Sequence, residues 1–197
     1  MGMATASKGW TREEVLALQD AARPGVRYEL IDGELLVSPS PTSPHQLVVD
    51  AFMFRLYGYC RQHGIGRAVT SPADLSLDGS SIMQPDVFVV PAGTRFRWEG
   101  WDTVTRLLLA VNVLSPSTAR GDRTVKRAFL QRNRVPEYWI VDHHARLVER
   151  WRPEDERPEI VTGTLTWQPV AAIEPLVIAL PELFTEALGE PPVDRPI

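Results

Sequence analysis

The sequence predicts an α/β domain of the α+β type, in which a mixed central β-sheet is flanked by helices. Two apolar runs, 87–90 and 107–114, have the length and continuous hydrophobicity of strands that are covered on both faces. Segments with helical spacing precede and follow them, and strands and helices alternate irregularly along the chain. The length of 197 residues suits one domain. We expect it to span 11–187, between a disordered lead-in at 1–10 and a loose tail at 188–197.

A helix and a hairpin are expected at the start of the domain. Thr11 and Glu14 have the T-x-x-E spacing of a capping box, which predicts a helix from about 11 to 21. Residues 28–38 then predict two short strands joined by Asp32-Gly33, a dipeptide that suits a turn with two positive φ angles. One helix and one hairpin therefore precede the main apolar runs.

The remaining elements follow in the order helix, strands, helix, strands. A long helix is expected from about 45 to 63, because its apolar residues have helical spacing and Gly64 can end it. Another helix is expected from about 122 to 133. The apolar and alternating segments predict strands at 66–70, 74–79, 81–90, 107–114, 135–142, 147–152, 159–169 and 176–180, before a short helix at 181–184.

Composition and charge limit the classes of function. The chain is 44% hydrophobic and 23% charged, as soluble globular proteins are, and no apolar run approaches the roughly 18 residues that span a membrane. Its start lacks the apolar core of a signal peptide, and its single cysteine suits a reducing compartment, so we expect a cytoplasmic protein with Cys60 packed in the core. The net charge of -4 gives no general attraction for nucleic acid, so binding DNA would require a local basic patch.

Two acids are candidates for a metal site. Asp86 follows Gln84-Pro85 at the head of an apolar strand, and with a second carboxylate it could bind Mg²⁺. Asp86 could equally cap a turn. Glu34 is the second acid; it begins the strand after the hairpin turn, where a solvated glutamate is the ordinary finding. The pattern leaves both a metal site and two separate structural acids open.

Basic residues gather on the predicted helix that follows the second apolar run. Lys126 lies four residues after Asp122, which would give a surface ion pair worth a few tenths of a kcal/mol, or else Lys126 reaches from the helix flank over the strand ends. From 115 to 134 there are six Arg or Lys residues against one Asp, a local balance of +5. Arg123 and Arg127 could therefore contact phosphates, although a solvated helix face has the same pattern.

Two more polar residues are candidates for substrate contact. His45 begins the long helix, where it could cap the helix or face a substrate. Gln84 directly precedes Pro85-Asp86 and could assist the same site.

The order of several motifs resembles a known family. The runs YELIDGELLVSPSPTSPHQ, QPD, LLLAVNVLSPST, D-x-x-x-K and VPEYWIVD are similar to those of the Uma-two family of bacterial restriction-endonuclease-like proteins, in the PD-(D/E)XK nuclease superfamily. The resemblance covers about Tyr28 to Arg150. It implies a restriction-endonuclease-like core, cleavage of DNA phosphodiesters with Mg²⁺ or Mn²⁺, and a homodimer that cuts both strands.

The resemblance also implies roles for particular residues. Asp86 matches the aspartate of the PD motif, Lys126 matches a lysine displaced to the following helix, and Glu34 matches an N-terminal glutamate. Asp86 with Glu34 or Asn112 would bind the metal ion that activates a water, and Lys126 would orient that water or neutralise developing charge. The residues that would contact the substrate are Gln84, His45, Arg123 and Arg127.

One position departs from the family pattern. The strand motif that usually reads E-V-L-S-P-S reads N-V-L-S-P-S here, so Asn112 stands where a second metal-binding carboxylate is expected. An amide in place of the carboxylate removes an attraction to the metal ion of about 8 kcal/mol at a separation of about 4 Å. The desolvation of the carboxylate would have offset much of this attraction. The remainder of a few kcal/mol would weaken metal affinity about 100-fold or more. Three hypotheses follow: a Mg²⁺-dependent DNA endonuclease, a catalytically weakened relative that binds nucleic acid or a protein partner, or a structural module that assembles through apolar strand edges.

Overall fold

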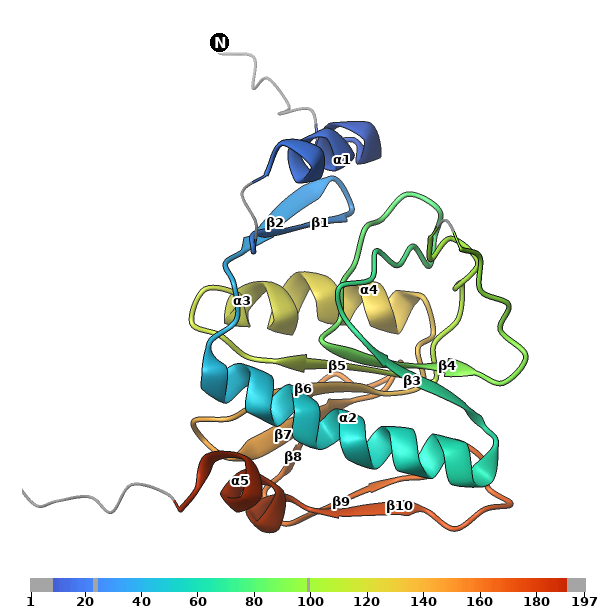
Figure 1. Ribbon diagram of the computed structural model, residues 1–197, viewed down its shortest axis with the longest axis vertical. Helices are drawn as coiled ribbons and strands as arrows, with labels where there is room; N and C mark the ends of the chain where they lie inside the picture. Colours follow the sequence, from blue (N-terminus) through green and yellow to red (C-terminus); the bar gives the residue numbers. More distant parts are fainter. Residues whose placement is uncertain (1–8, 23–24, 99, 191–197) are drawn as a thin grey trace, which may run out of the picture.

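A six-stranded mixed sheet forms the centre of the computed structural model, which describes residues 9–22, 25–98 and 100–190 (Figure 1). β5 and β6 are parallel, and all other neighbours in this sheet are antiparallel. The predicted α+β class with a mixed central sheet is therefore confirmed. In spatial order the strands are β3 (Gly66–Thr70), β4 (Val87–Pro91), β5 (Leu109–Val113), β6 (Tyr138–Asp142), β7 (Leu147–Trp151) and β8 (Glu159–Val161).

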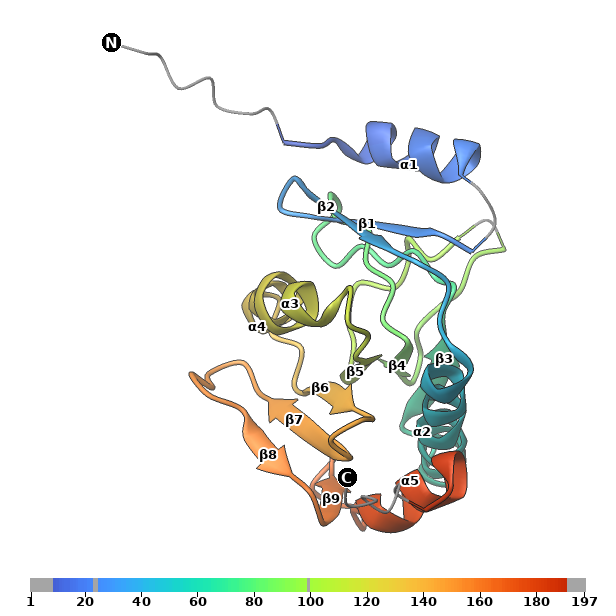
Figure 2. The same ribbon diagram turned by 90° about the vertical axis from the view of Figure 1, so that its left-hand side faces the viewer.

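Smaller sheets and helices surround the central sheet. Two antiparallel pairs stand apart from it: β1 (Arg27–Ile31) with β2 (Glu34–Ser38), and β9 (Thr164–Trp167) with β10 (Leu176–Ala179). The helices are α1 (Arg12–Ala21), α2 (Ser43–His63), the continuous segment α3 (Ala119–Gly121), η1 (Asp122–Lys126, a π-helical turn) and α4 (Arg127–Arg132), and α5 (Leu180–Leu188). In Figures 1 and 2, α2 and α5 lie against one face of the sheet and the α3–α4 segment lies against the other.

The sheet separates two apolar cores. Successive side chains of a strand point to opposite faces, and every residue of Val87–Val90 is buried, as expected for a strand covered on both faces. The odd-numbered valines of β4 pack in one core with Phe52 of α2. Phe88 and Ala110 pack in the other core with Phe129 of α4. Even-numbered residues of β4 and β5 therefore face the α3–α4 segment.

The β1–β2 hairpin forms as predicted. Asp32 and Gly33 have φ angles of 54° and 79°, the two positive values that this two-residue turn requires. One face of the hairpin carries Leu30, which packs with Val15 of α1. Leu30 also exchanges two backbone hydrogen bonds of 2.8 Å with Ile82, which fastens the hairpin to the segment before β4. The opposite face of the hairpin points toward the main sheet and α3–α4.

Several element boundaries differ from the predictions. The expected strand at 74–79 is wrong: this segment makes only an isolated bridge between Leu75 and Met83. The chain turns there because the Asp78 carboxylate accepts the N–H groups of Ser80 and Ser81, which bends the backbone away from a neighbouring strand. The strand expected at 81–90 is reduced to β4.

The helices differ less. The capping box of Thr11 and Glu14 is present, and α2 ends at Gly64 in the left-handed conformation. The helix expected from about 122 begins instead at Ala119 and contains the π-helical turn η1. Most of the predicted lead-in and tail, 1–8 and 191–197, lies outside the described residues.

Two expectations drawn from composition can be compared with the structure. Cys60 is buried in α2 without a disulfide partner, and burial raises the pKa of its thiol to about 11, so it packs as an inert core residue. No helix in the described part of the chain combines the length and the apolar character needed to cross a membrane.

Candidate functional site

The register of β4 and β5 brings Asp86 and Asn112 together. Val87 lies opposite Val111 in this antiparallel pair, so one further step along the ladder sets Asp86 opposite Asn112. Directly opposed residues share a face with about 5 Å between their Cβ atoms. Both side chains are on the face of α3–α4, and with Lys126 they line a cleft of about 200 Å³.

Asp86 is buried and surrounded by donors. It is 4% exposed, its Oδ1 accepts from Nη1 of Arg27 at 2.8 Å, and its Oδ2 accepts the N–H of Val113 at 2.9 Å. Nε2 of His45 lies 3.3 Å from the same Oδ2. Burial raises the pKa of Asp86, but His45 and Arg27 outweigh burial and the pKa is lowered. The carboxylate is therefore ionised at neutral pH and already has a positive partner.

This pairing gives stability that depends on pH. A carboxyl group with a depressed pKa stabilises the fold above its unfolded value, near 3.9, and that contribution is lost as pH falls through the folded value. We expect the free energy of unfolding of the wild-type chain to fall more steeply from about pH 5 down to about pH 2 than that of Asp86→Asn. Urea denaturation at several pH values measures both slopes, and parallel curves would contradict the assignment.

Lys126 lies at the centre of a second buried group, the Glu29–Lys126–Asp122 cluster. Its Nζ is 2.7 Å from Oε2 of Glu29 and 3.0 Å from Oδ1 of Asp122, and none of the three residues is more than 3% exposed. Burial lowers the pKa of Lys126, but the two carboxylates outweigh it and raise the pKa. Burial raises the pKa of Glu29. The expected ion pair of Lys126 with Asp122 does form, but it is buried rather than at the surface, because the hairpin covers this side of the helix.

The π-helical turn and Tyr138 join the two groups. Asp122 and Lys126 are the first and last residues of η1, and both are buried toward the cleft. The hydroxyl of Tyr138 donates to Oδ1 of Asn112 at 3.3 Å and lies 3.5 Å from the backbone oxygen of Asp122. Burial raises the pKa of Tyr138 well above that of an exposed tyrosine, so its hydroxyl remains a proton donor. Such π-helical turns occur frequently at functional sites.

Glu34 is not brought to either group, and Glu29 occupies the place expected for it. Glu34 is exposed beside the hairpin turn, opposite Ile31, whereas Glu29 pairs with Leu36 about 7 Å further along the same face. Glu29 accepts the N–H of Gln84 at 2.8 Å as well as pairing with Lys126. The sequence did indicate that Glu29 would be buried, because Glu29 lies two residues before the apolar Ile31 and residues two apart in a strand share a face.

The other side chain expected near Asp86 in sequence points elsewhere. Gln84 donates from Nε2 to Oδ1 of Asp74 at 2.6 Å, outside the cleft of Asp86. His45 does lie in the cleft, and its expected capping role is wrong: Thr42 is the N-cap residue and the helix has no side-chain cap.

The basic residues of the α3–α4 segment are mostly paired with acids from other elements. Arg123 bonds Oε1 of Glu149 at 2.6 to 2.7 Å, and the pKa of Arg123 is raised by this contact. Arg127 stacks over the ring of Trp151 at 4.8 Å. Arg132 pairs with an aspartate of the hairpin turn. The local balance of +5 in the sequence therefore does not become a free basic patch.

The donor set does not suit a divalent cation in this arrangement. Mg²⁺ requires oxygen ligands in octahedral geometry, usually including carboxylates. Both oxygens of Asp86 already accept from protein groups, Asn112 brings no charge, and Glu29 is held by Lys126. Within 9–22, 25–98 and 100–190, no group of three or more His, Cys, Asp or Glu side chains is placed to hold a metal ion. Arg27 instead gives Asp86 the positive charge that an ion would supply.

Comparisons with known proteins agree with this fold. A crystal structure of a protein from Anabaena variabilis, described as a putative nuclease belonging to DUF820, matches 91% of this chain and 99% of that chain with a TM-score of 0.68. The sequence identity is 18%, so this likeness concerns the fold. No curated protein matches the chain. The family model Uma2, described as "Putative restriction endonuclease", matches residues 12–181. The chain therefore shares the fold of that crystal structure and belongs to the Uma2 family.

Proposed function

We propose that the chain is a nuclease-fold protein that binds DNA at the cleft of Asp86, Asn112 and Lys126, with phosphodiester hydrolysis weakened by the amide at position 112. The observation that carries this proposal is the register that sets Asn112 opposite Asp86. A glutamate there would give two adjacent carboxylates on one face of the sheet. The amide leaves a single carboxylate, which Arg27 neutralises.

The groups that can meet a phosphate lie at the rim of the cleft. The ammonium of Lys126 is enclosed between two carboxylates, so it is not available as a free cation. The side chain of Arg27 is 24% exposed and has five N–H donors, one of which bonds Asp86. Hydroxyl groups of the loop before α3 line the same cleft, namely those of Ser115, Ser117 and Thr118. Arg27 and these hydroxyls would bind the phosphate, while the buried groups below hold the rim in place.

A second candidate function is a Mg²⁺- or Mn²⁺-dependent DNA endonuclease acting as a homodimer. The specific observation in its favour is that Asp86 and Lys126, both ionised, share one cleft with the further carboxylates of Glu29 and Asp122. Cleavage would then require that the Arg27–Asp86 pair opens to admit an ion. The mass of the chain in solution, measured by light scattering, tests the homodimer.

Binding and cleavage assays distinguish the two functions. Fluorescence anisotropy with labelled oligonucleotides in EDTA should show binding that weakens as salt rises, because phosphate contacts release counterions. Incubation with Mg²⁺ or Mn²⁺ should leave plasmid and oligonucleotide DNA largely uncut. Robust cleavage that disappears in Asp86→Ala would establish the endonuclease instead, and absence of any DNA binding would overturn the first proposal.

A further inference from the structure

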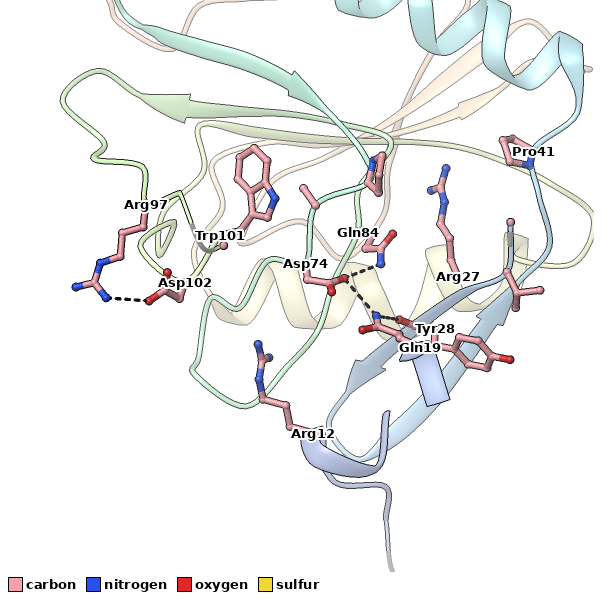
Figure 3. A pocket seen from close by; sticks show the side chains of 15 residues that line it. Arg12, Gln19, Arg27, Tyr28, Pro41, Asp74, Gln84, Arg97, Trp101 and Asp102 are labelled. Carbon is pink, nitrogen blue, oxygen red and sulfur yellow. Dashed lines mark hydrogen bonds and ion pairs between the residues drawn. The ribbon is translucent and has the colours of Figure 1, made fainter. Parts of the chain in front are cut away.

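A second cavity lies on the other side of Arg27. Its volume is about 840 Å³, within the range of about 300 to 1,000 Å³ typical of ligand sites. Figure 3 shows it between the N-terminal elements, which provide Arg12, Gln19 and Tyr28, and the segment that carries Arg97 and Trp101. None of the residues expected at the nuclease site contributes to it except Gln84. The cavity is therefore distinct from the cleft of Asp86.

The guanidinium groups of this cavity can bind an anion. Three of them line it, from Arg12, Arg27 and Arg97, together with the carboxylates of Asp74 and Asp102. One N–H of Arg27 bonds Asp86, which leaves its other N–H donors for a ligand. Arg97 pairs with Asp102 at 3.4 Å, but both side chains are more than 60% exposed, so the pair is weak. Planar guanidinium groups bind phosphate oxygens with two parallel hydrogen bonds.

One of the two aromatic residues that line the cavity, Trp101, is held in a fixed orientation. The ring of Trp101 is nearly perpendicular to those of Phe88 and Phe96, at 83° and 84°, with centroids 5.7 and 5.9 Å away. Figure 3 shows the indole on one side of the cavity and the bonded pair of Asp74 and Gln84 across from it. An indole that is already ordered loses little entropy when a flat ligand stacks on it. Bases of single-stranded nucleic acid stack on aromatic side chains in this way.

A buried acceptor also lines the cavity. Gln84 is 7% exposed, and its Nε2 donates to Asp74, which also accepts from Nε2 of Gln19 at 3.3 Å. Within the described residues, Oε1 of Gln84 accepts no hydrogen bond. A buried acceptor without a partner is unfavourable, because it has lost its hydrogen bonds to water. An N–H group on the edge of a ligand's ring would satisfy it.

We propose that this cavity receives one nucleotide of a single-stranded nucleic-acid segment, with the base stacked on Trp101 and its phosphate on the arginines. This inference rests on the proposed function, because Arg27 lines both the cavity and the cleft and so connects a bound nucleotide to the phosphate at Asp86. A blunt duplex keeps its bases stacked inside and cannot fill the cavity. An acidic peptide would use the arginines but not the indole.

The experiment compares two tryptophans of one surface segment. Trp101→Ala should weaken binding of a labelled single-stranded oligonucleotide about 10-fold or more, since stacking of one base is worth about 1–3 kcal/mol. Trp98 is fully exposed and lies outside this cavity, so Trp98→Ala should bind within about 2-fold of wild type. A blunt duplex should bind more weakly than the single strand and be insensitive to Trp101→Ala.

Trp101→Phe keeps an aromatic core residue if the alanine variant fails to fold. It should retain intermediate affinity and lose most of the tryptophan quenching that oligonucleotide binding causes in wild type. Equal oligonucleotide affinity of Trp101→Ala and wild type would overturn the proposed nucleotide site in the cavity, whereas the proposal of DNA binding at the cleft would stand. Equal displacement of the oligonucleotide by a glutamate-rich peptide would also overturn it. Failure of wild type to bind any nucleic acid would overturn both proposals.

Discussion

Lys126→Met is expected to lower the free energy of unfolding by about 3–5 kcal/mol, the usual result when one partner of a buried ion pair is removed. Methionine fills a similar volume, but the carboxylates of Glu29 and Asp122 are then left buried without a cation. The loss should shrink at low pH, because protonation of Glu29, whose pKa is already raised, removes one of the uncompensated charges. Urea denaturation at about pH 7 and pH 5 measures both effects.

A matched control lies just beyond the same helical segment, which ends at Arg132. Arg134 pairs with Glu154, but the side chains are 73% and 79% exposed, so Arg134→Met should cost less than about 1 kcal/mol. The double variant Glu29→Gln with Lys126→Met should recover part of the stability lost by Lys126→Met alone. If Lys126→Met were no more harmful than Arg134→Met, the buried cluster would not contribute as described.

Asn112→Glu is expected to create metal affinity about 100-fold or more above wild type, because it sets a second carboxylate opposite Asp86. Without an ion the two acids repel each other, so the variant should be less stable than wild type. Added Mg²⁺ should then restore stability, by about 2.7 kcal/mol when the ion is at about 100 times its dissociation constant. Thermal unfolding with and without Mg²⁺ and isothermal calorimetry measure these changes, and DNA cleavage is a further readout.

Asn112→Gln is the control for size, since it has the length of glutamate but no charge. It should show neither the loss of stability in EDTA nor the gain with Mg²⁺. If Asn112→Glu behaved like Asn112→Gln, the amide at position 112 would not be what weakens the site, and Arg27 would become the principal obstacle. Arg27→Ala combined with Asn112→Glu would then test whether the arginine excludes the ion.

Local patterns in the sequence were sufficient for most of the fold. The positive φ angles of Asp32-Gly33, the capping box at Thr11 and the continuous apolar run of β4 depend on neighbouring residues, and all three are present. The prediction of a strand at 74–79 was wrong because Leu75, which is buried, and Leu77, which is partly buried, lie in a loop that the Asp78 carboxylate bends. Alternating apolar and polar residues indicate that the apolar side chains face the core, and a loop can bury them without pairing to a neighbouring strand.

The candidate site was harder to predict because it depends on how separate sheets pack. Asp86 and Lys126 could be named from motifs, but their partners Arg27 and Glu29 come from a hairpin outside the main sheet. The predicted acid, Glu34, is in β2 directly after the turn, whereas the acid that reaches Lys126 is Glu29 in β1. The spacing of residues within 86–126 therefore could not show that Lys126 is buried or that Arg27 neutralises the charge of Asp86.

The β1–β2 hairpin links the assembly of the fold to the charge state of the cleft. A partly folded chain that has its main sheet but not the docked hairpin lacks both Arg27 and Glu29, so Asp86 would face solvent ions and Lys126 would meet Asp122 alone. Local opening of such a peripheral unit costs less than global unfolding. A molecule that binds or cleaves the undocked hairpin would therefore also expose Asp86 to cations from solvent. Cation binding at Asp86 would then depend on whether the hairpin is docked.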